Sequence, residues 1–260
     1  MTKKHDIIWL TSADSTNKEA QRRISDIDNL SVLSATEQTE GRGQRGNTWS
    51  SESGKNLLFS VVLKFSDTVF EGGLLPEMNA HDQFVISEAA SLAIVDLLAE
   101  NDIEAKIKWP NDIYVNSRKI CGILIENSLK GPSLSYSIIG IGLNVNQTSF
   151  DPTLPNPTSI SLETGNSYDL KDMLERYMEI FCHYISRYCN PHGGYAKLRT
   201  LYLSQMWRKG EISDFIDRTK SPEVKFKGTI AGLSDIGHLL IKTTEGELRE
   251  FSFQEVSYII

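Results

Sequence analysis

The sequence predicts an α+β protein with a second, smaller β domain at its C-terminal end. Two observations indicate this fold class. Strand-like and helix-like segments alternate up to about residue 209, without the regular rhythm of βαβ units. Beyond that point only short strand-like segments punctuated by glycines follow, which is typical of a small barrel or open sheet. Because 260 residues can hold one large core and one small one, we expect domains over residues 1–209 and 210–260.

The first strands and the first helix follow from local signals. Residues 7–10 and 30–36 are short apolar runs, and residues 57–65 form a longer β-like segment. Between the first two runs, Thr16 and Glu19 match a capping box, in which each side chain satisfies a free backbone N–H. We therefore expect a helix to begin there.

Three longer segments have the apolar spacing of α-helices. Residues 80–100 place one apolar stripe on a single helical face, and its members are Ile86, Ala89, Ala90, Ala93, Ile94 and Leu97. A second stripe runs through residues 170–185, and a third helix is expected near residues 196–206.

The remaining strand-like segments fall into two groups. In the larger domain they are residues 104–109, 113–115, 119–126 and 136–145, the last interrupted by Gly140 and Gly142. In the C-terminal domain they are residues 224–230, 239–241, 248–253 and 256–260. The second group is the basis for the small β domain.

Composition narrows the class of protein. The net charge of -7 argues against tight nonspecific binding to nucleic acid, which needs clustered Lys and Arg. No apolar run is long enough for a membrane span or a signal peptide, so we expect a cytoplasmic protein without a membrane partner. Cys182 and Cys189 lie two helical turns apart, and with Cys121 they are expected to stay reduced.

A glycine-rich loop, residues 40–55, contains the sequence from Gly41 to Gly46 that reads G-x-G-x-x-G. A dinucleotide fold would require a helix at the third glycine, but the following residues are poor helix formers and lead into a strand. The sequence motifs of a protein kinase are absent as well. What remains is a flexible loop whose Arg42 and Arg45 can bind phosphate or carboxylate, or a solvated charged loop without function.

A second group of polar residues lies at a strand end. Pro110 interrupts the strand pairing, so Lys108, Trp109, Asn111 and Asp112 are presented together. Alone, this group could equally be an edge-strand charge beside a buried indole.

Together, these segments resemble the catalytic domain of biotin–protein ligases, the holocarboxylase synthetase family. The matching pieces occur in the family's order and cover nearly the whole chain. They are residues 14–17, Gln38, residues 41–46, the K-W-P-N-D sequence at residues 108–112, and residues 119–126 and 140–146. The resemblance implies a mixed β-sheet flanked by helices, and a C-terminal domain that is SH3-like.

The resemblance also implies an ATP-dependent reaction in two steps. The biotin carboxylate attacks the α-phosphorus of ATP to give biotinyl-5′-adenylate, and a lysine of a biotin carboxyl carrier domain then displaces AMP. Mg²⁺ would be held mainly by the ATP phosphates, because the five histidines are scattered and no side-chain metal site is evident. A homodimer is compatible with the resemblance.

Residue roles are carried over position by position. Lys108, Arg42 and Asp112 are the implied catalytic residues, with Lys108 between the biotin carboxylate and the α-phosphate and Asp112 oriented toward the acceptor lysine. The residues implied in biotin binding are Ser15, Thr16, Asn17, Gln38, Arg42, Gly43, Gln44 and Lys108. Those implied in ATP binding are Arg45, Trp49, Asn111, Lys119 and Asn144. Some relatives carry arginine where this chain has Gln44, which bears on retention of the adenylate.

Two alternatives stay open. A lipoate–protein ligase or octanoyltransferase has a related fold, but the K-W-P-N-D sequence and the arginines of the loop favour biotin. A sensor that binds biotin or nucleotide without turnover is disfavoured by Lys108, Arg42 and Lys119. Because the first strand begins by Ile7, we expect no DNA-binding module and no repressor activity.

Overall fold

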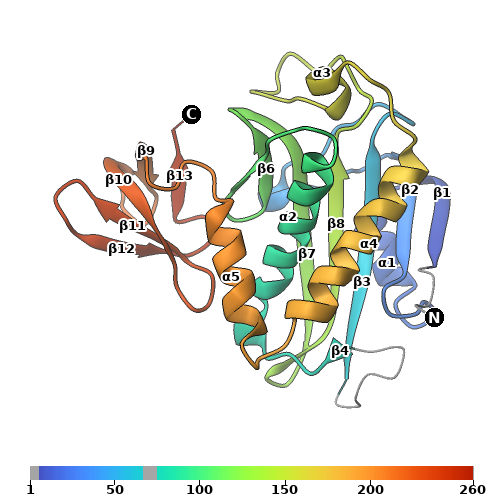
Figure 1. Cartoon of the computed structure of the whole chain (residues 1–260), viewed down its shortest axis with the longest axis horizontal. Coiled ribbons are helices and arrows are strands. Elements are labelled where there is room, and N and C mark those ends of the chain that lie inside the picture. Colours follow the sequence, from blue (N-terminus) through green and yellow to red (C-terminus); the bar gives the residue numbers. More distant parts are fainter. Residues whose placement is uncertain (1–5, 67–74, 260) are drawn as a thin grey trace.

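The computed structural model describes residues 6–66 and 75–259. Within these residues an eight-stranded sheet has the order β1-β2-β3-β8-β7-β6-β5, with β4 paired to β3 (Figure 1). The β1–β2 and β3–β4 pairs are parallel and the other pairs are antiparallel, so the expected mixed sheet is confirmed. The strands are β1 (Ile7–Ala13), β2 (Val32–Gln38), β3 (Leu57–Ser66), β4 (Leu75–Pro76), β5 (Lys106–Lys108), β6 (Asp112–Val115), β7 (Arg118–Lys130) and β8 (Ser133–Leu143).

Helices cover both faces of this sheet. The long helices α2 (Phe84–Ala99), α4 (Leu170–Tyr188) and α5 (Gly194–Ser204) pack together on one face, and α1 (Thr16–Arg22) lies on the opposite face (Figure 1). A short helix, α3 (Ile160–Thr164), was not predicted from the sequence. In the described part of the chain, none of the helices has the length and apolar character needed to span a membrane.

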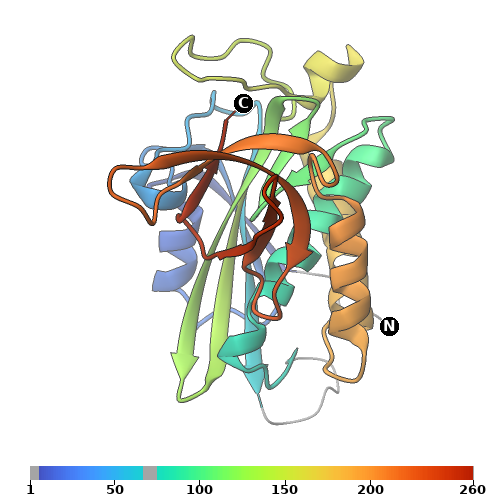
Figure 2. The ribbon, with the colours of Figure 1, turned by 90° about the vertical axis from the view of Figure 1, so that its left-hand side faces the viewer.

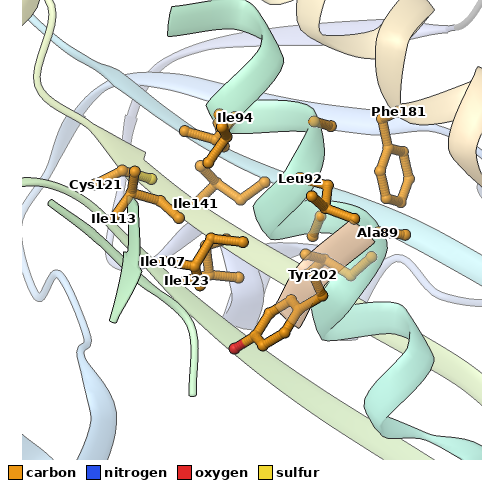
Figure 3. Close-up of a cluster of buried hydrophobic side chains, with 14 of the residues drawn as sticks. Ala89, Leu92, Ile94, Ile107, Ile113, Cys121, Ile123, Ile141, Phe181 and Tyr202 are labelled. Atoms are coloured by element: carbon orange, nitrogen blue, oxygen red, sulfur yellow. The ribbon is translucent and has the colours of Figure 1, made fainter. Parts of the chain in front are cut away.

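Helix α2 is the centre of the core. The sequence predicted one apolar face, but the helix is buried almost all round, because the sheet covers one side and α4 and α5 cover the other. Ile94 packs near strand residues such as Ile141 (Figure 3). The small polar residues Ser87 and Ser91 on the same helix are buried too, which is why the stripe appeared narrower in the sequence than it is in the fold.

The capping box expected at the start of α1 is wrong. The N-cap residue is Ser15, and its own side chain makes no capping hydrogen bond. Glu19 forms ion pairs with Arg22 and Arg23 instead. The Thr16 backbone N–H donates to Gln38 Oε1 over 2.8 Å, so a side chain from the end of β2 satisfies the helix start.

The C-terminal residues form a second, five-stranded antiparallel sheet of order β12-β11-β10-β9-β13, which packs beside the main sheet (Figure 2). Its strands are β9 (Ile212–Asp217), β10 (Val224–Leu233), β11 (Leu239–Thr243), β12 (Leu248–Phe251) and β13 (Val256–Tyr258). Strand β9 was not predicted. The sheet begins two residues after the predicted boundary at residue 210, and the division into domains stays a prediction.

The second sheet is tied to the main body by contacts with buried residues. The Trp109 indole N–H donates to the Gly237 carbonyl over 2.9 Å. Gly237 has φ +87°, and an added Cβ would lie 2.2 Å from the Phe84 ring, so only glycine fits against α2 here. Arg199 of α5 ion-pairs with the buried Glu88 of α2 and donates to the Ser234 carbonyl. These contacts fix the second sheet against the ends of α2 and β5.

Candidate active site

One cavity of about 640 Å³ opens on the face of the main sheet that carries α1. Its walls combine α1, the glycine loop, the end of β5, the first half of β7, the end of β8, and the C-terminal sheet. The lining residues that the sequence singled out are Ser15, Thr16, Asn17, Gln38, Arg42, Gly43, Gln44, Trp49, Lys108, Trp109, Pro110, Asp112 and Lys119. The glycine loop and Lys108 therefore open into the same cavity.

Glycines on two paired strands make the floor of the cavity. Gly122 of β7 is paired with Gly142 of β8, and both lie under the Trp49 indole. A Cβ at Gly142 would lie 2.4 Å from Trp49 Cε2, and one at Gly140 would lie 2.3 Å from Asn17 Oδ1. Glycine is required at these strand positions because two other side chains pack directly against the backbone. In the sequence, the glycines that interrupt the strand-like segment at residues 136–145 were the signal that other side chains approach this backbone closely.

Neutral polar groups gather at the α1 end of the cavity. Thr16 Oγ1 lies 3.2 Å from Gln38 Oε1, and the hydroxyl of Ser60, on β3, lies 2.7 Å from Thr16 Oγ1. Asn17 Nδ2 donates to Glu126 Oε2 over 2.8 Å, and Asn17 Oδ1 lies 2.6 Å from the Ser60 hydroxyl. This network holds donors and acceptors in fixed positions on a buried surface. Ser60 was not predicted, because nothing near it in the sequence marks it.

The glycine loop folds back on itself over residues 41–49. The Gly43 N–H donates to the Asn47 carbonyl over 2.7 Å, and the Trp49 N–H donates to the Gly41 carbonyl over 2.9 Å. Gly41 is needed for this fold, since an added Cβ would lie 2.3 Å from the Trp49 carbonyl oxygen. Arg42 reaches Glu126 of β7 in an ion pair of 3.0 Å. The side chain of Arg45 lies outside the described residues.

At the other end of the cavity, the side chain of Lys108 is surrounded by aromatic rings. Its ammonium lies 4.7 Å from the ring centre of Tyr114, 5.8 Å from that of Trp207 and 5.4 Å from that of Tyr258. It also donates to the Tyr114 hydroxyl over 3.2 Å. The pKa of Lys108 is lowered to about 8, mainly by burial; Asp112 opposes this shift, and the nearby Lys119 and Arg208 add to it.

Asp112 and Lys119 form an ion pair of 2.6 Å on neighbouring strands, β6 and β7. The Lys119 ammonium also lies 5.7 Å from the Trp49 ring. Asp112 is the register partner of Lys108 across the β5–β6 pair. Its carboxylate is therefore engaged by Lys119, and no ion pair joins it to Lys108 among the described side chains.

Two of the residues assigned to nucleotide binding do not line this cavity. Asn111 is buried, donates to the Ile123 carbonyl over 2.7 Å and accepts from Gln44 Nε2 over 2.6 Å. Asn144 is buried beyond the end of β8, where its Nδ2 donates to the Thr158 carbonyl. Asn144 Oδ1 has no hydrogen-bond partner in the described part of the chain.

The C-terminal sheet adds wall residues that sequence reasoning missed. Val256, Ser257 and Tyr258 of β13 line the cavity, and so does Arg218, which follows β9. They are more than a hundred residues away from the K-W-P-N-D sequence. No local pattern in the sequence marks them as parts of the site.

The donor set at the cavity does not form a metal cage. Asp112 is the carboxylate that lines it, and Lys119 already neutralises that charge. Among the described residues no three His, Cys, Asp or Glu side chains are grouped at metal-ligand distance. Mg²⁺ commonly binds proteins through one or two carboxylates while substrate phosphates supply the other ligands, so this donor set fits a cation that arrives with a polyphosphate.

The fold and cavity define a class of protein with a pocket on a mixed sheet that is lined by neutral hydrogen-bonding side chains and by an ammonium. Comparison with known proteins identifies the class further. The profile of the Biotin/lipoate A/B protein ligase family matches residues 9–144. The chain belongs to this family.

Individual relatives agree with this assignment. A biotin–[acetyl-CoA-carboxylase] ligase of Paracoccus denitrificans is 30% identical over 244 residues, covering 91% of this chain and 94% of that protein. The bifunctional ligase/repressor BirA of Bacillus subtilis is 29% identical over 252 residues, covering 95% of this chain and 71% of that protein. A biotin protein ligase structure from Aquifex aeolicus, in complex with biotin and ATP, has a TM-score of 0.76 at 28% identity and covers 98% of both chains.

Proposed function

We propose that this protein is a biotin–protein ligase that uses ATP to join biotin to a lysine of a biotin carboxyl carrier domain. In the first step a biotin carboxylate oxygen bonds to the α-phosphorus, and the bond to pyrophosphate breaks. In the second step the acceptor amine bonds to the carboxyl carbon, the mixed-anhydride C–O bond breaks, AMP leaves and the amine proton passes to solvent. Atoms and charge balance in both steps.

One observation supports this function most directly. A neutral hydrogen-bonding end, formed by Thr16, Asn17 and Gln38, and a partly buried ammonium, that of Lys108, line one cavity. The ureido ring of biotin needs acceptors for two N–H groups and a donor for its carbonyl, which short polar side chains can supply. Its carboxylate, at the other end of the ligand, needs a cation. The cavity meets both requirements, with hydrogen-bonding side chains at one end and an ammonium at the other.

Lys108 has the central catalytic role in this proposal. The first step brings a carboxylate toward a polyphosphate, and a fixed cation between them stabilises the charge that grows in the transition state. Arg42 supports the same step from the glycine loop, where it can exchange Glu126 for an anionic ligand. Ser15, Gly43 and Gln44 complete the proposed biotin contacts.

The nucleotide is proposed to lie over the Trp49 side of the cavity. Trp49 Nε1 is buried without a hydrogen-bond partner among the described residues, so it offers a donor to a ligand. Lys119 and Arg45 supply positive charge for phosphates, and Mg²⁺ enters bound to ATP. Asn111 contributes by holding Gln44. Asn144 does not line the cavity, so its proposed contribution to the nucleotide site is the hold it keeps on the segment after β8 through the Thr158 carbonyl.

Asp112 is proposed to guide the acceptor lysine. Its carboxylate faces the cavity and carries an ion pair with Lys119. An incoming ammonium can share this carboxylate, which lowers the cost of bringing a second cation near Lys108. The acceptor amine would then be held close to the adenylate. We place the reaction in the cytoplasm, without nucleic acid as a partner and with a homodimer as one assembly to test.

The test is pyrophosphate release from ATP with biotin, followed by biotin transfer to a purified carrier domain. Lipoate and octanoate, which also carry a carboxylate, replace biotin in the matched control reactions. The proposal requires pyrophosphate and carrier biotinylation with biotin, and much less with the two fatty acids. Adenylation of lipoate in preference to biotin would identify the other branch of the family. Binding of biotin without pyrophosphate release would indicate a sensor.

A further inference from the structure

The last strand of the C-terminal sheet reaches the side chain that the proposed chemistry depends on. Tyr258 of β13 lines the cavity, and its ring lies 5.4 Å from the Lys108 ammonium. Tyr114 and Trp207, both from the main body, complete the surrounding of that ammonium. One of the three rings next to Lys108 therefore comes from a strand that lies more than a hundred residues later in the sequence.

The cations around the cavity differ in how their charge is balanced. Arg42 is ion-paired with Glu126, Lys119 with Asp112, and Arg218 lies 3.6 Å from Glu223. Lys108 has no carboxylate partner among the described side chains, and its ammonium is held by π faces and one phenol oxygen. An aromatic face stabilises a cation without neutralising it. Lys108 thus keeps its full charge for an anionic ligand.

Tyr258 is itself held in place on two sides. Its ring lies 5.7 Å from Trp207 and 5.2 Å from Phe215 of β9. The next residue, Ile259, donates its N–H to the Asp214 carbonyl over 2.9 Å and accepts from Arg208 Nη1 over 3.3 Å. The position of the ring is therefore set jointly by the C-terminal sheet and by the segment that follows α5.

We infer that Tyr258 is a positioning residue for Lys108, so that the C-terminal sheet completes the adenylation site by closing an aromatic enclosure around the ammonium. This inference rests on the proposed function, since it assigns Tyr258 to the same step. It explains why the second sheet is fixed so firmly to α2 and β5. A displaced C-terminal sheet would leave the ammonium hydrated and free to move.

The groups that face Lys108 give the direction of the effect. Asp112 favours its charged form, whereas Lys119, Arg208 and burial disfavour it. The Tyr114 and Tyr258 rings favour the charged form. Replacing Tyr258 by an aliphatic side chain of similar bulk removes a π face but keeps the ammonium buried, so the pKa of Lys108 should fall below its value of about 8.

The experiment measures the titration of Lys108 by competitive acetylation of the full-length protein across pH, with mass spectrometry of the Lys108 peptide. In Tyr258→Leu we expect the pKa to fall by about one unit, a tenfold change in the protonation equilibrium. Tyr258→Phe retains the ring and should restore the wild-type pKa. Trp9→Leu, an aromatic-to-leucine change at an exposed position on β1, is the matched control and should leave this pKa and the activity unchanged.

The same variants are then assayed for pyrophosphate release as a function of pH. The alkaline limb of the Tyr258→Leu profile should move to lower pH by the same amount as the Lys108 pKa. An unchanged Lys108 pKa in folded Tyr258→Leu would overturn the inference, and Tyr258→Met provides the same comparison if the leucine variant does not fold. If wild-type protein releases no pyrophosphate, the proposed function fails, while the acetylation result still decides the role of Tyr258.

Discussion

Gln44 Nε2 donates to Asn111 Oδ1 over 2.6 Å, which joins the glycine loop to the turn between β5 and β6. Asn111 in turn donates to the Ile123 carbonyl on β7. The loop over the cavity is therefore tied, through one amide pair, to the segment that carries Lys108.

The first prediction concerns retention of the adenylate. In Gln44→Gly the loop loses its attachment to Asn111, so it should open more often and release biotinyl-5′-adenylate. We expect several-fold more biotin on bystander lysines of serum albumin, measured by streptavidin blot. Gln254→Gly, a matched change at an exposed position with φ +80°, should not increase this labelling. Equal labelling by wild type and Gln44→Gly would contradict a gating role for the loop.

The second prediction concerns Lys108. Removing one positioned charge from a transition state costs about 3–4 kcal/mol, so Lys108→Ala should slow adenylate formation by about 10²–10³-fold. The measurement is single-turnover formation of biotinyl-5′-adenylate at saturating biotin and ATP. Lys106→Ala is the control, because Lys106 is on the same strand but contacts Glu104 and Gln205 outside this cavity. Comparable rates in both variants would remove Lys108 from its proposed role.

The third prediction is a pH profile. The pKa of Lys108 is lowered to about 8 by burial, so its ammonium is present below that pH and is lost as the pH rises through it. Adenylation should therefore decline above about pH 8. Lys108→Arg keeps a charged side chain at these pH values, so its rate should be lower but should show no decline near pH 8. A wild-type profile that is flat up to pH 9.5 would argue against a buried, titrating lysine.

The fourth prediction concerns stability. Burial raises the pKa of Glu88 from 4.5 to about 7, and Arg199 beside it opposes this by less. The folded state thus binds the proton more tightly than the unfolded state, so this stabilisation is present below about pH 4.5 and lost as the pH rises through about 7. The effect is on the order of 3 kcal/mol.

Denaturant unfolding of wild type and Glu88→Gln between pH 5 and 8 measures this effect. The free energy of unfolding of wild type should decline with pH more steeply than that of the variant, which carries no titrating carboxyl at this position. Glu175→Gln, at an exposed position on α4, should follow the wild-type slope. Identical slopes for all three proteins would show that Glu88 keeps its charge throughout this range.

Much of the fold followed from local patterns. Apart from β4, which was not predicted, the strands of the main sheet and the long helices α2, α4 and α5 lie where apolar spacing predicted them. Strand β9 was missed because its residues, such as Asp214 and Asp217, interrupt the apolar pattern and are accommodated only by neighbouring strands. The capping box failed because Gln38 arrives from β2 to satisfy the start of α1, a contact that depends on the tertiary fold.

The site was predictable where function concentrates residues in short segments. Residues 15–17, residues 42–44 of the glycine loop and Lys108 were marked by sequence, and the fold brings them to one cavity. Site residues that stand alone in the sequence could not be predicted in this way. Ser60 looks like an ordinary strand serine, and Tyr258 like an ordinary apolar strand residue, until the two sheets are packed together.

The most direct test of the central idea is a crystal structure of the protein with biotin and a non-hydrolysable ATP analogue. We predict that Lys108 Nζ will lie within hydrogen-bonding distance of both the biotin carboxylate and the α-phosphate, with the ureido ring against Thr16 and Asn17. A structure in which biotin or nucleotide occupies a different cavity, with Lys108 contacting neither ligand, would contradict the account.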